Sequence, residues 1–144
     1  MPPRPAKPLS LGALLADSPH TRPLPITVTA EHPDIQQRYD VEPSRYEGPT
    51  GIVGVLTDTA GRTGITTLSA WAAIPHYAAA APSPKATLAM VVKLEELLDA
   101  VIEHADLPDA AAAWQRGVDD LAANDDEVAE YVQALEQAQD TTDL

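Results

Sequence analysis

Polar side chains that could bind a ligand lie beside predicted strands. His20 stands just before residues 24–29, in which apolar and polar side chains alternate. His76 follows the strand-forming residues 65–71, and ligand sites of α/β proteins gather at the ends of strands. Arg22, two residues after His20, has the charge and geometry to hold a phosphate or a carboxylate. A structural hydrogen-bonding role also fits both histidines and is the interpretation we favour.

A loop with glycine and proline, YEGPTG at residues 46–51, leads into an apolar run. Its Glu47 could accept ribose hydroxyls, and its glycines permit backbone angles that bring amide groups to a ligand. The loop has neither the GKS/T end of a P-loop nor the dinucleotide-binding pattern G-x-G-x-x-G. A tight loop that threads a strand into a sheet explains it equally well. The candidate ligand residues are therefore His20, Arg22, Glu47, Gly48, Thr50, Gly51 and His76.

No pattern typical of a metal or catalytic centre occurs in the sequence. The four histidines are isolated and lack the HExxH spacing of helical zinc ligands. Cysteine is absent, so thiolate ligands and disulfides are excluded. There is no G-x-S-x-G nucleophile elbow, and the acidic residues 119–127 lack the central glycine of an EF-hand. We therefore expect no cofactor, no metal and no enzymatic activity.

The charge of the chain is unevenly distributed. The formal net charge is -13, and residues 94–144 contain fifteen Asp and Glu but a single Arg. Residues 1–93 hold eight Lys and Arg against seven Asp and Glu. An acidic surface repels phosphates, so we expect no nucleic-acid partner. It permits a basic protein partner, although a solvated helical face that keeps the protein soluble is the interpretation we favour.

Length and hydropathy indicate one soluble domain. The 144 residues suffice for a single core. The N-terminus, MPPRPAKPLS, lacks the apolar run of a signal peptide, and no segment is long and apolar enough to span a membrane. We expect a cytoplasmic protein that is not attached to a membrane. Residues 1–8, which contain four prolines, are expected to be disordered.

The first half of the chain predicts short elements. Residues 9–16 are expected to form one or two helical turns. Residues 24–29 predict a strand with one buried face, and two nearby prolines place its start at the edge of a sheet. Residues 33–39 predict a short helix that begins at Pro33.

The middle of the chain predicts a strand–helix–strand unit. The apolar run GIVGVL at residues 51–56 does not alternate, which is typical of a central parallel strand covered on both faces. Asp58 is expected to cap a short helical turn that Gly64 ends. Residues 65–71 then return as a strand, which predicts a parallel pair with a right-handed crossover.

The last part of the chain predicts three helices. Ser83 and Pro84 form a helix start, with the serine as the cap. A second helix opens at Pro108, and Asn124 or Asp125 separates it from a third. Their apolar residues recur at helical spacing and are expected to face the core: Leu88, Val91, Leu94, Leu98 and Val101, then Trp114, Val118 and Leu121, then Val128, Tyr131, Val132 and Leu135. Trp114 and Tyr131 are candidate contacts for a protein partner.

These elements predict an α/β half-domain at residues 9–82. Helices of the same domain follow at residues 83–140, with a tail at residues 141–144. Three strands with these helices do not make a sheet covered on both faces. Either another chain completes the sheet or part of the protein is missing. An unpaired sheet edge also favours self-association.

Four segments in order resemble actinobacterial-type members of the proteasome assembly chaperone family. They are LGALLADSPHTRPLPIT (11–27), SRYEGPTGIVGVL (44–56), LSAWAAIPHYAAAAPSPKATLAMV (68–91) and LAANDDEVAEYVQALEQAQD (121–140). The parts YEGPTG and WAAIPHY, with the following PSPKATL, are the most specific. Members of the family are considerably longer, and the resemblance covers their C-terminal half.

The resemblance implies an α/β fold similar to that of nucleoside phosphorylases, with a partial parallel or mixed sheet, flanking helices and an acidic helical C-terminal region. It implies protein binding without catalysis. In eukaryotic relatives this role is to help proteasome subunits assemble. We therefore expect protein partners, proteasome subunits among them. The alternative is a nucleoside-like small molecule, bound or hydrolysed by the candidate ligand residues.

Overall fold

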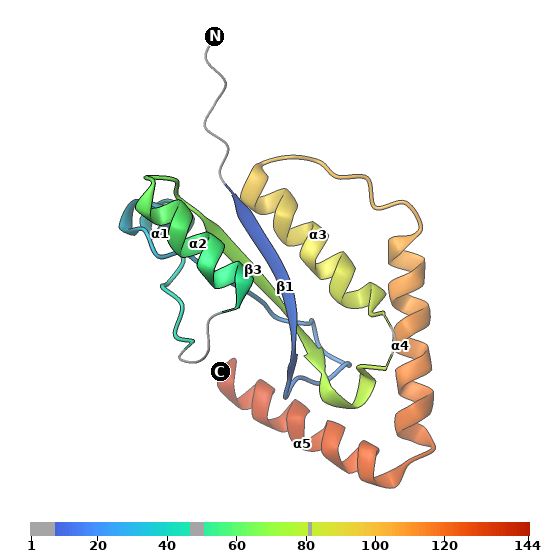
Figure 1. Cartoon of the computed structure of the whole chain (residues 1–144). Helices are drawn as coiled ribbons and strands as arrows, with labels where there is room; N and C mark the ends of the chain where they lie inside the picture. Colours follow the sequence, from blue (N-terminus) through green and yellow to red (C-terminus); the bar gives the residue numbers. More distant parts are fainter. Residues whose placement is uncertain (1–7, 47–50, 81) are drawn as a thin grey trace. The chain divides into compact units, whose positions relative to one another are not determined.

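The computed structural model describes residues 8–46, 51–80 and 82–144 (Figure 1). Its elements are β1 (Leu9–Ala16), β2 (Ile26–Thr29), α1 (Pro33–Tyr39), α2 (Ile52–Arg62), β3 (Leu68–Pro75), the 3-10 helix η1 (His76–Ala78), α3 (Pro84–Leu98), α4 (Leu107–Ala123) and α5 (Asp126–Thr142). The combination of strands and helices confirms the predicted α/β fold class. The predicted disorder of residues 1–8 concerns positions that lie, apart from Pro8, outside the described residues. No helix within the described ranges has the length and apolar character needed to cross a membrane.

The described strands form a three-stranded sheet in the order β1-β3-β2. β1 and β3 run in the same direction, as two successive contacts between them show. The backbone N–H of Leu68 donates to the carbonyl of Pro8 at 3.1 Å, and the hydroxyls of Ser10 and Ser69 lie 2.6 Å apart. The parallel neighbour of β3 is therefore β1 and not the predicted strand at residues 51–56.

β2 runs antiparallel to β3. Pro25, just before β2, accepts a hydrogen bond from the backbone of Ala73 near the end of β3 at 3.0 Å. Ala30, just after β2, packs with Leu68 at the beginning of β3. The sheet is therefore mixed, as the resemblance implied.

The helical turns expected at residues 9–16 are wrong, because this segment is the strand β1. Leu9, Leu11, Ala13 and Leu15 also recur with a period of two, with Ser10 and Gly12 between the first three. That periodicity suits a strand, and pairing with β3 decides in its favour. Tertiary context has overridden the helix propensity of leucine and alanine.

Gly12 is required in β1 by a close approach of the Trp71 ring. A Cβ atom added at Gly12 would lie 2.4 Å from Cζ3 of Trp71. We expect Gly12→Ala to lower the free energy of unfolding by about 1–3 kcal/mol through overpacking, as measured by urea denaturation. The matched control is Gly61→Ala, because a Cβ at Gly61 meets nothing within 4 Å and alanine favours the helix there. Equal effects at both positions would contradict the ring contact.

The strand expected at residues 51–56 is also wrong, because these residues begin the helix α2. None of the side chains in α2 is buried. Periodicity alone does not separate a short apolar run in a strand from one in a helix. The predicted strand–helix–strand unit over residues 51–71 therefore does not form.

The end of α2 follows the predicted glycine. Gly64 has a left-handed backbone with φ of 79°, and the N–H of Ile65 returns to the carbonyl of Ala60 at 2.9 Å. This is the usual C-terminal glycine arrangement of a helix. Asp58 does not cap the helix as expected, since it lies inside α2 and pairs with Arg62 at 3.0 Å.

Other predicted elements are confirmed with shifted bounds. β2 lies within residues 24–29, and β3 begins three residues later than expected. α1 begins at Pro33, and the side chain of His32 accepts a hydrogen bond from the N–H of Asp34 at 3.2 Å as the N-cap. The strand position of Leu24 is wrong, although its predicted burial is right.

The three C-terminal helices begin within one residue of the predicted positions. Ser83 caps α3 by accepting from the N–H of Ala86 at 3.2 Å, and Asp125 caps α5. α3 ends at Leu98, because Asp99 adopts a left-handed backbone with φ of 47°. The core-facing role expected of Val101 is therefore wrong, since Val101 lies beyond the helix and is 96% exposed. Leu98 is exposed as well.

The chain divides into two compact units. The first comprises residues 1–12 and 27–71, and the second comprises residues 13–26 and 72–144. A cluster in the first unit contains buried Ala30, Ile35 and Leu68, with Leu9, Val28, Tyr39 and Val41 packed against it. A cluster in the second unit contains buried Leu24, Ala72 and Ala86, with Ile26, Ile74, Met90 and Trp114 packed against it. The candidate site described next lies in the second unit.

Candidate functional site

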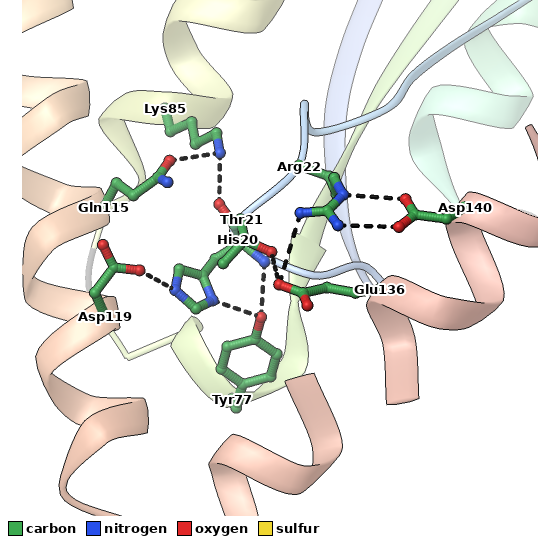
Figure 2. Close-up of polar contacts among 9 residues, drawn as sticks. All are labelled: His20, Thr21, Arg22, Tyr77, Lys85, Gln115, Asp119, Glu136 and Asp140. Atoms are coloured by element: carbon green, nitrogen blue, oxygen red, sulfur yellow. Dashed lines mark hydrogen bonds and ion pairs between the residues drawn. The ribbon is translucent and has the colours of Figure 1, made fainter. Parts of the chain in front are cut away.

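A polar network surrounds residues 17–22, which we call the His20 loop (Figure 2). The His20 side chain is only 1% exposed. Its Nε2 lies 2.8 Å from Oδ1 of Asp119 on α4, and its Nδ1 lies 2.9 Å from the hydroxyl of Tyr77 on η1. The backbone N–H of His20 donates to the same hydroxyl at 2.7 Å. Both ring nitrogens of a buried histidine are therefore engaged.

The hydrogen bonds of His20 fit the tautomer that carries its proton on Nε2. The Tyr77 hydroxyl accepts from the backbone N–H of His20, and its single proton is then directed to Nδ1. The other ring nitrogen, Nε2, carries the proton and donates it to the Asp119 carboxylate. Burial raises the pKa of Tyr77, which keeps its phenol protonated and able to donate.

Lys85 of α3 holds the backbone of the same loop. Its ammonium donates to the carbonyl of His20 and, at 2.7 Å, to Oε1 of Gln115 on α4. Burial lowers the pKa of Lys85, and the nearby carboxylate of Asp119 opposes that shift. Three elements, α3, α4 and η1, thus bind one loop residue.

Helix α5 binds the next two residues of the loop. The hydroxyl of Thr21 donates to Glu136, and the guanidinium of Arg22 meets Asp140 with two parallel bonds, Nε at 3.1 Å and one terminal nitrogen at 3.0 Å. Oε1 of Glu136 also lies 3.7 Å from the terminal nitrogen Nη1 of Arg22. Such a two-bond pair fixes orientation as well as charge. The donor fork of Arg22 is therefore occupied by carboxylates of its own chain.

Tyr131 of α5 contacts both η1 and the start of the loop. The ring of Tyr131 meets that of Tyr77 edge to face, with centroids 5.9 Å apart. The hydroxyl of Tyr131 donates to Oδ1 of Asp17 at 2.8 Å, and this bond raises the pKa of the phenol. His76 lies 3.6 Å from the same carboxylate oxygen of Asp17.

The pair formed by Arg22 and Asp140 predicts a pH dependence. The hydrogen bond from Arg22 holds the pKa of Asp140 below its ordinary value of 3.8. The unfolded chain then binds more protons in acid, so the contribution of the pair is present above that ordinary value and is lost as pH falls through the folded pKa. We expect Asp140→Asn to flatten the acid limb of the unfolding free energy, measured by urea denaturation at several pH values. Asp143→Asn is the control, and an unchanged acid limb for Asp140→Asn would contradict the pairing.

The structure brings some of the candidate ligand residues together. His20 and Arg22 lie in the loop, and His76 stands on η1 beside Asp17. Gly51 belongs to the first unit, where it precedes α2 as the N-cap. Glu47, Gly48 and Thr50 lie outside the described residues. Of the candidate partner contacts, Trp114 packs on the cluster around Leu24, and Tyr131 is 39% exposed.

Sequence reasoning missed most of the network, namely Tyr77, Lys85, Gln115, Asp119, Glu136 and Asp140. A usable pattern existed for four of them. Gln115 and Asp119 are four residues apart, as are Glu136 and Asp140, so each pair lies on one helix face. Within the described ranges, no three His, Asp or Glu side chains gather in a way that could hold a metal ion.

Comparison with known proteins places the chain in a family. The model of the PAC2 family matches residues 6–122. The chain belongs to the PAC2 family. Helix α5, which supplies Glu136 and Asp140, lies beyond the matched residues. A comparison with the curated proteins found no match.

Solved structures of PAC2 relatives have the same fold. A PAC2 family protein from Streptomyces avermitilis is 51% identical with a TM-score of 0.78, over 86% of this chain and 52% of that one. A proteasome-assembly chaperone homologue from Mycobacterium tuberculosis is 45% identical with a TM-score of 0.73, over 86% and 52%. A second Mycobacterium tuberculosis protein, of unknown function, is 26% identical with a TM-score of 0.81, over 93% and 46%. The chain thus spans about half the length of these relatives, and the predicted family resemblance is confirmed.

Proposed function

We propose that this chain is a non-enzymatic protein-binding protein that acts in the assembly of protein complexes, with proteasome subunits among its partners. The observation that supports this most is the 45% identity, over 86% of the chain, to a proteasome-assembly chaperone homologue. Self-association and a cytoplasmic location belong to the same proposal.

The polar network supports a positioning role for the His20 loop. His20, Lys85 and Arg22 make hydrogen bonds to groups of this chain, which leaves their main donors engaged. A new ligand would compete with the carboxylates and the carbonyl that these groups already bind. The network is thus suited to fixing α3, α4 and α5 around the loop. No contact among the described residues favours the small-molecule alternative.

The acidic helices supply a surface for a basic partner. Residues 94–144 contain fifteen Asp and Glu against a single Arg. Such a surface attracts a basic protein at long range, and the attraction weakens as salt screens it. Tyr131 combines an exposed aromatic ring with this acidic surrounding, and aromatic residues are enriched among strong contacts at interfaces. We propose Tyr131, with Trp114, as contacts for the partner.

Binding to purified proteasome α and β subunits from an actinobacterium tests this proposal. We expect binding by biolayer interferometry that weakens with added salt, and about a tenfold weaker affinity for Tyr131→Ala. Tyr131→Phe keeps the ring but loses the bond to Asp17, so it separates the ring contact from the fold. Val101→Ala, at a 96% exposed position, is the control. Absence of binding by the wild-type chain to every subunit would refute the assembly role.

A further inference from the structure

Helix α5 differs from α3 and α4 in how it is anchored. α3 and α4 pack closely on each other and contribute Ala86, Met90 and Trp114 to the apolar cluster around Leu24. α5 contributes no residue to that cluster, and Val132 is its one buried side chain. Because most of the stability of a helix in a protein comes from packing of its apolar face, α5 gains less from packing than its two neighbours.

The contacts that tie α5 to the His20 loop are polar. Glu136 accepts a hydrogen bond from the Thr21 hydroxyl, and Tyr131 donates one to the beginning of the loop. The guanidinium of Arg22 lies between Glu136 and Asp140 (Figure 2). These two carboxylates are four residues apart and so lie on one face of α5, where a single guanidinium reaches both.

The charges of α4 and α5 oppose their contact. α5 carries five acidic side chains and no basic one, and α4 carries three acidic side chains and one arginine. Like charges on neighbouring helices repel each other. Among the described residues, Arg22 is the one basic side chain that forms an ion pair with α5. The attraction between opposite charges that holds α5 therefore comes from one residue of the loop.

The connection between α4 and α5 allows one helix to move without the other. α4 ends at Ala123 and α5 begins at Asp126, so two residues join them. Asp125 caps α5 through the N–H groups of Glu127 and Val128, and these cap bonds do not involve α4. A short helix that has lost its packing is only marginally stable in water. An α5 that leaves the loop should therefore also unfold.

We propose that α5 is a latch that Arg22 holds closed, and that it opens and unfolds as a unit while α3, α4 and the buried cluster stay folded. Local openings of this kind involve contiguous segments whose stability is below that of the whole domain. Opening frees the guanidinium of Arg22 and the hydroxyl of Thr21, and it uncovers Tyr77, on which the ring of Tyr131 packs. The latch does not depend on which partner the chain binds.

Hydrogen–deuterium exchange of the full chain, followed for each amide by NMR, tests the latch. We expect the central amides of α5 to exchange at least about tenfold faster than those of α3 and α4. Arg22→Gln removes the ion pairs and should accelerate exchange in α5 by about threefold more, with α3 unchanged. Arg45→Gln is the matched control, because Arg45 pairs with Glu42 in the first unit.

Asp140→Asn tests the same ion pair from the side of α5. We expect it to accelerate exchange in α5, and we expect the double variant with Arg22→Gln to match Arg22→Gln alone, because the two residues act through one pair. Glu130→Gln, at an exposed position of α5, is the control that should not accelerate exchange.

Three results would overturn the latch. They are wild-type exchange in α5 as slow as in α3, exchange in α5 that Arg22→Gln leaves unchanged, and an acceleration by Arg22→Gln that is equal in all three helices. The last result would mean that Arg22 stabilises the second unit as a whole. The comparison of helices in the wild-type chain needs no substitution, so it decides even where a variant fails to fold.

Discussion

His20→Ala is expected to lower the free energy of unfolding by about 3 kcal/mol. The substitution removes a side chain that is 1% exposed and leaves a cavity. It also takes both ring hydrogen bonds from the loop, so the Tyr77 hydroxyl loses its acceptor and Asp119 loses its donor. Urea denaturation followed by circular dichroism measures the loss.

Two further variants separate the causes of this loss. Tyr77→Phe keeps the ring of Tyr77 and the volume of His20 but leaves the His20 N–H without its partner, which should cost about 1–3 kcal/mol. His104→Ala is the matched control, because His104 is partly exposed and its pair with Glu95 is local in the chain. A His20→Ala variant no less stable than His104→Ala would show that the network does not stabilise the fold.

Leu24→Ala is expected to lower the free energy of unfolding by about 2–5 kcal/mol. Leu24 is 4% exposed and lies at the centre of the cluster in the second unit, with Ala72 and Ala86 as its buried neighbours. Ala72 and Ala86 are too small to fill the space that the leucine side chain leaves, so the cavity should remain. Urea denaturation, again followed by circular dichroism, measures the loss.

Leu98→Ala is the matched control for this truncation. Leu98 is 58% exposed, so the same change should alter the free energy of unfolding by less than about 0.5 kcal/mol. Equal losses at the two positions would place the core of the second unit elsewhere. A smaller loss at Leu24 than about 1 kcal/mol would indicate that the neighbouring side chains collapse into the space.

The fold was predictable where a few neighbouring residues determine the start or the end of a helix. Pro33 at the start of α1, the Ser83 cap of α3 and the left-handed Gly64 after α2 each act through a few neighbouring residues. The two wrong elements are both apolar runs: β1 is rich in leucine and alanine, and the beginning of α2 consists of isoleucine, valine, leucine and one glycine. Their composition permits a helix or a strand, and pairing with β3 decides the first case.

The candidate site was predictable in its centre but not in its partners. His20 and Arg22 were identified as candidates because they stand just before a predicted strand. The structural role that we favoured for His20 agrees with the hydrogen bonds of its ring. The partners lie far away in sequence, since 99 residues separate His20 from Asp119 and 118 separate Arg22 from Asp140. Only the packing of α4 and α5 in the second unit brings these carboxylates to the loop.

The backbone hydrogen bond of His20 makes one amide proton a reporter for the whole network. This N–H donates to a side-chain hydroxyl of η1 and not to a strand or helix partner. Its exchange with solvent deuterium therefore requires Tyr77 to move away, whereas neighbouring amides can exchange through other openings. A single crosspeak in a nitrogen–proton spectrum would follow how often the loop and η1 separate.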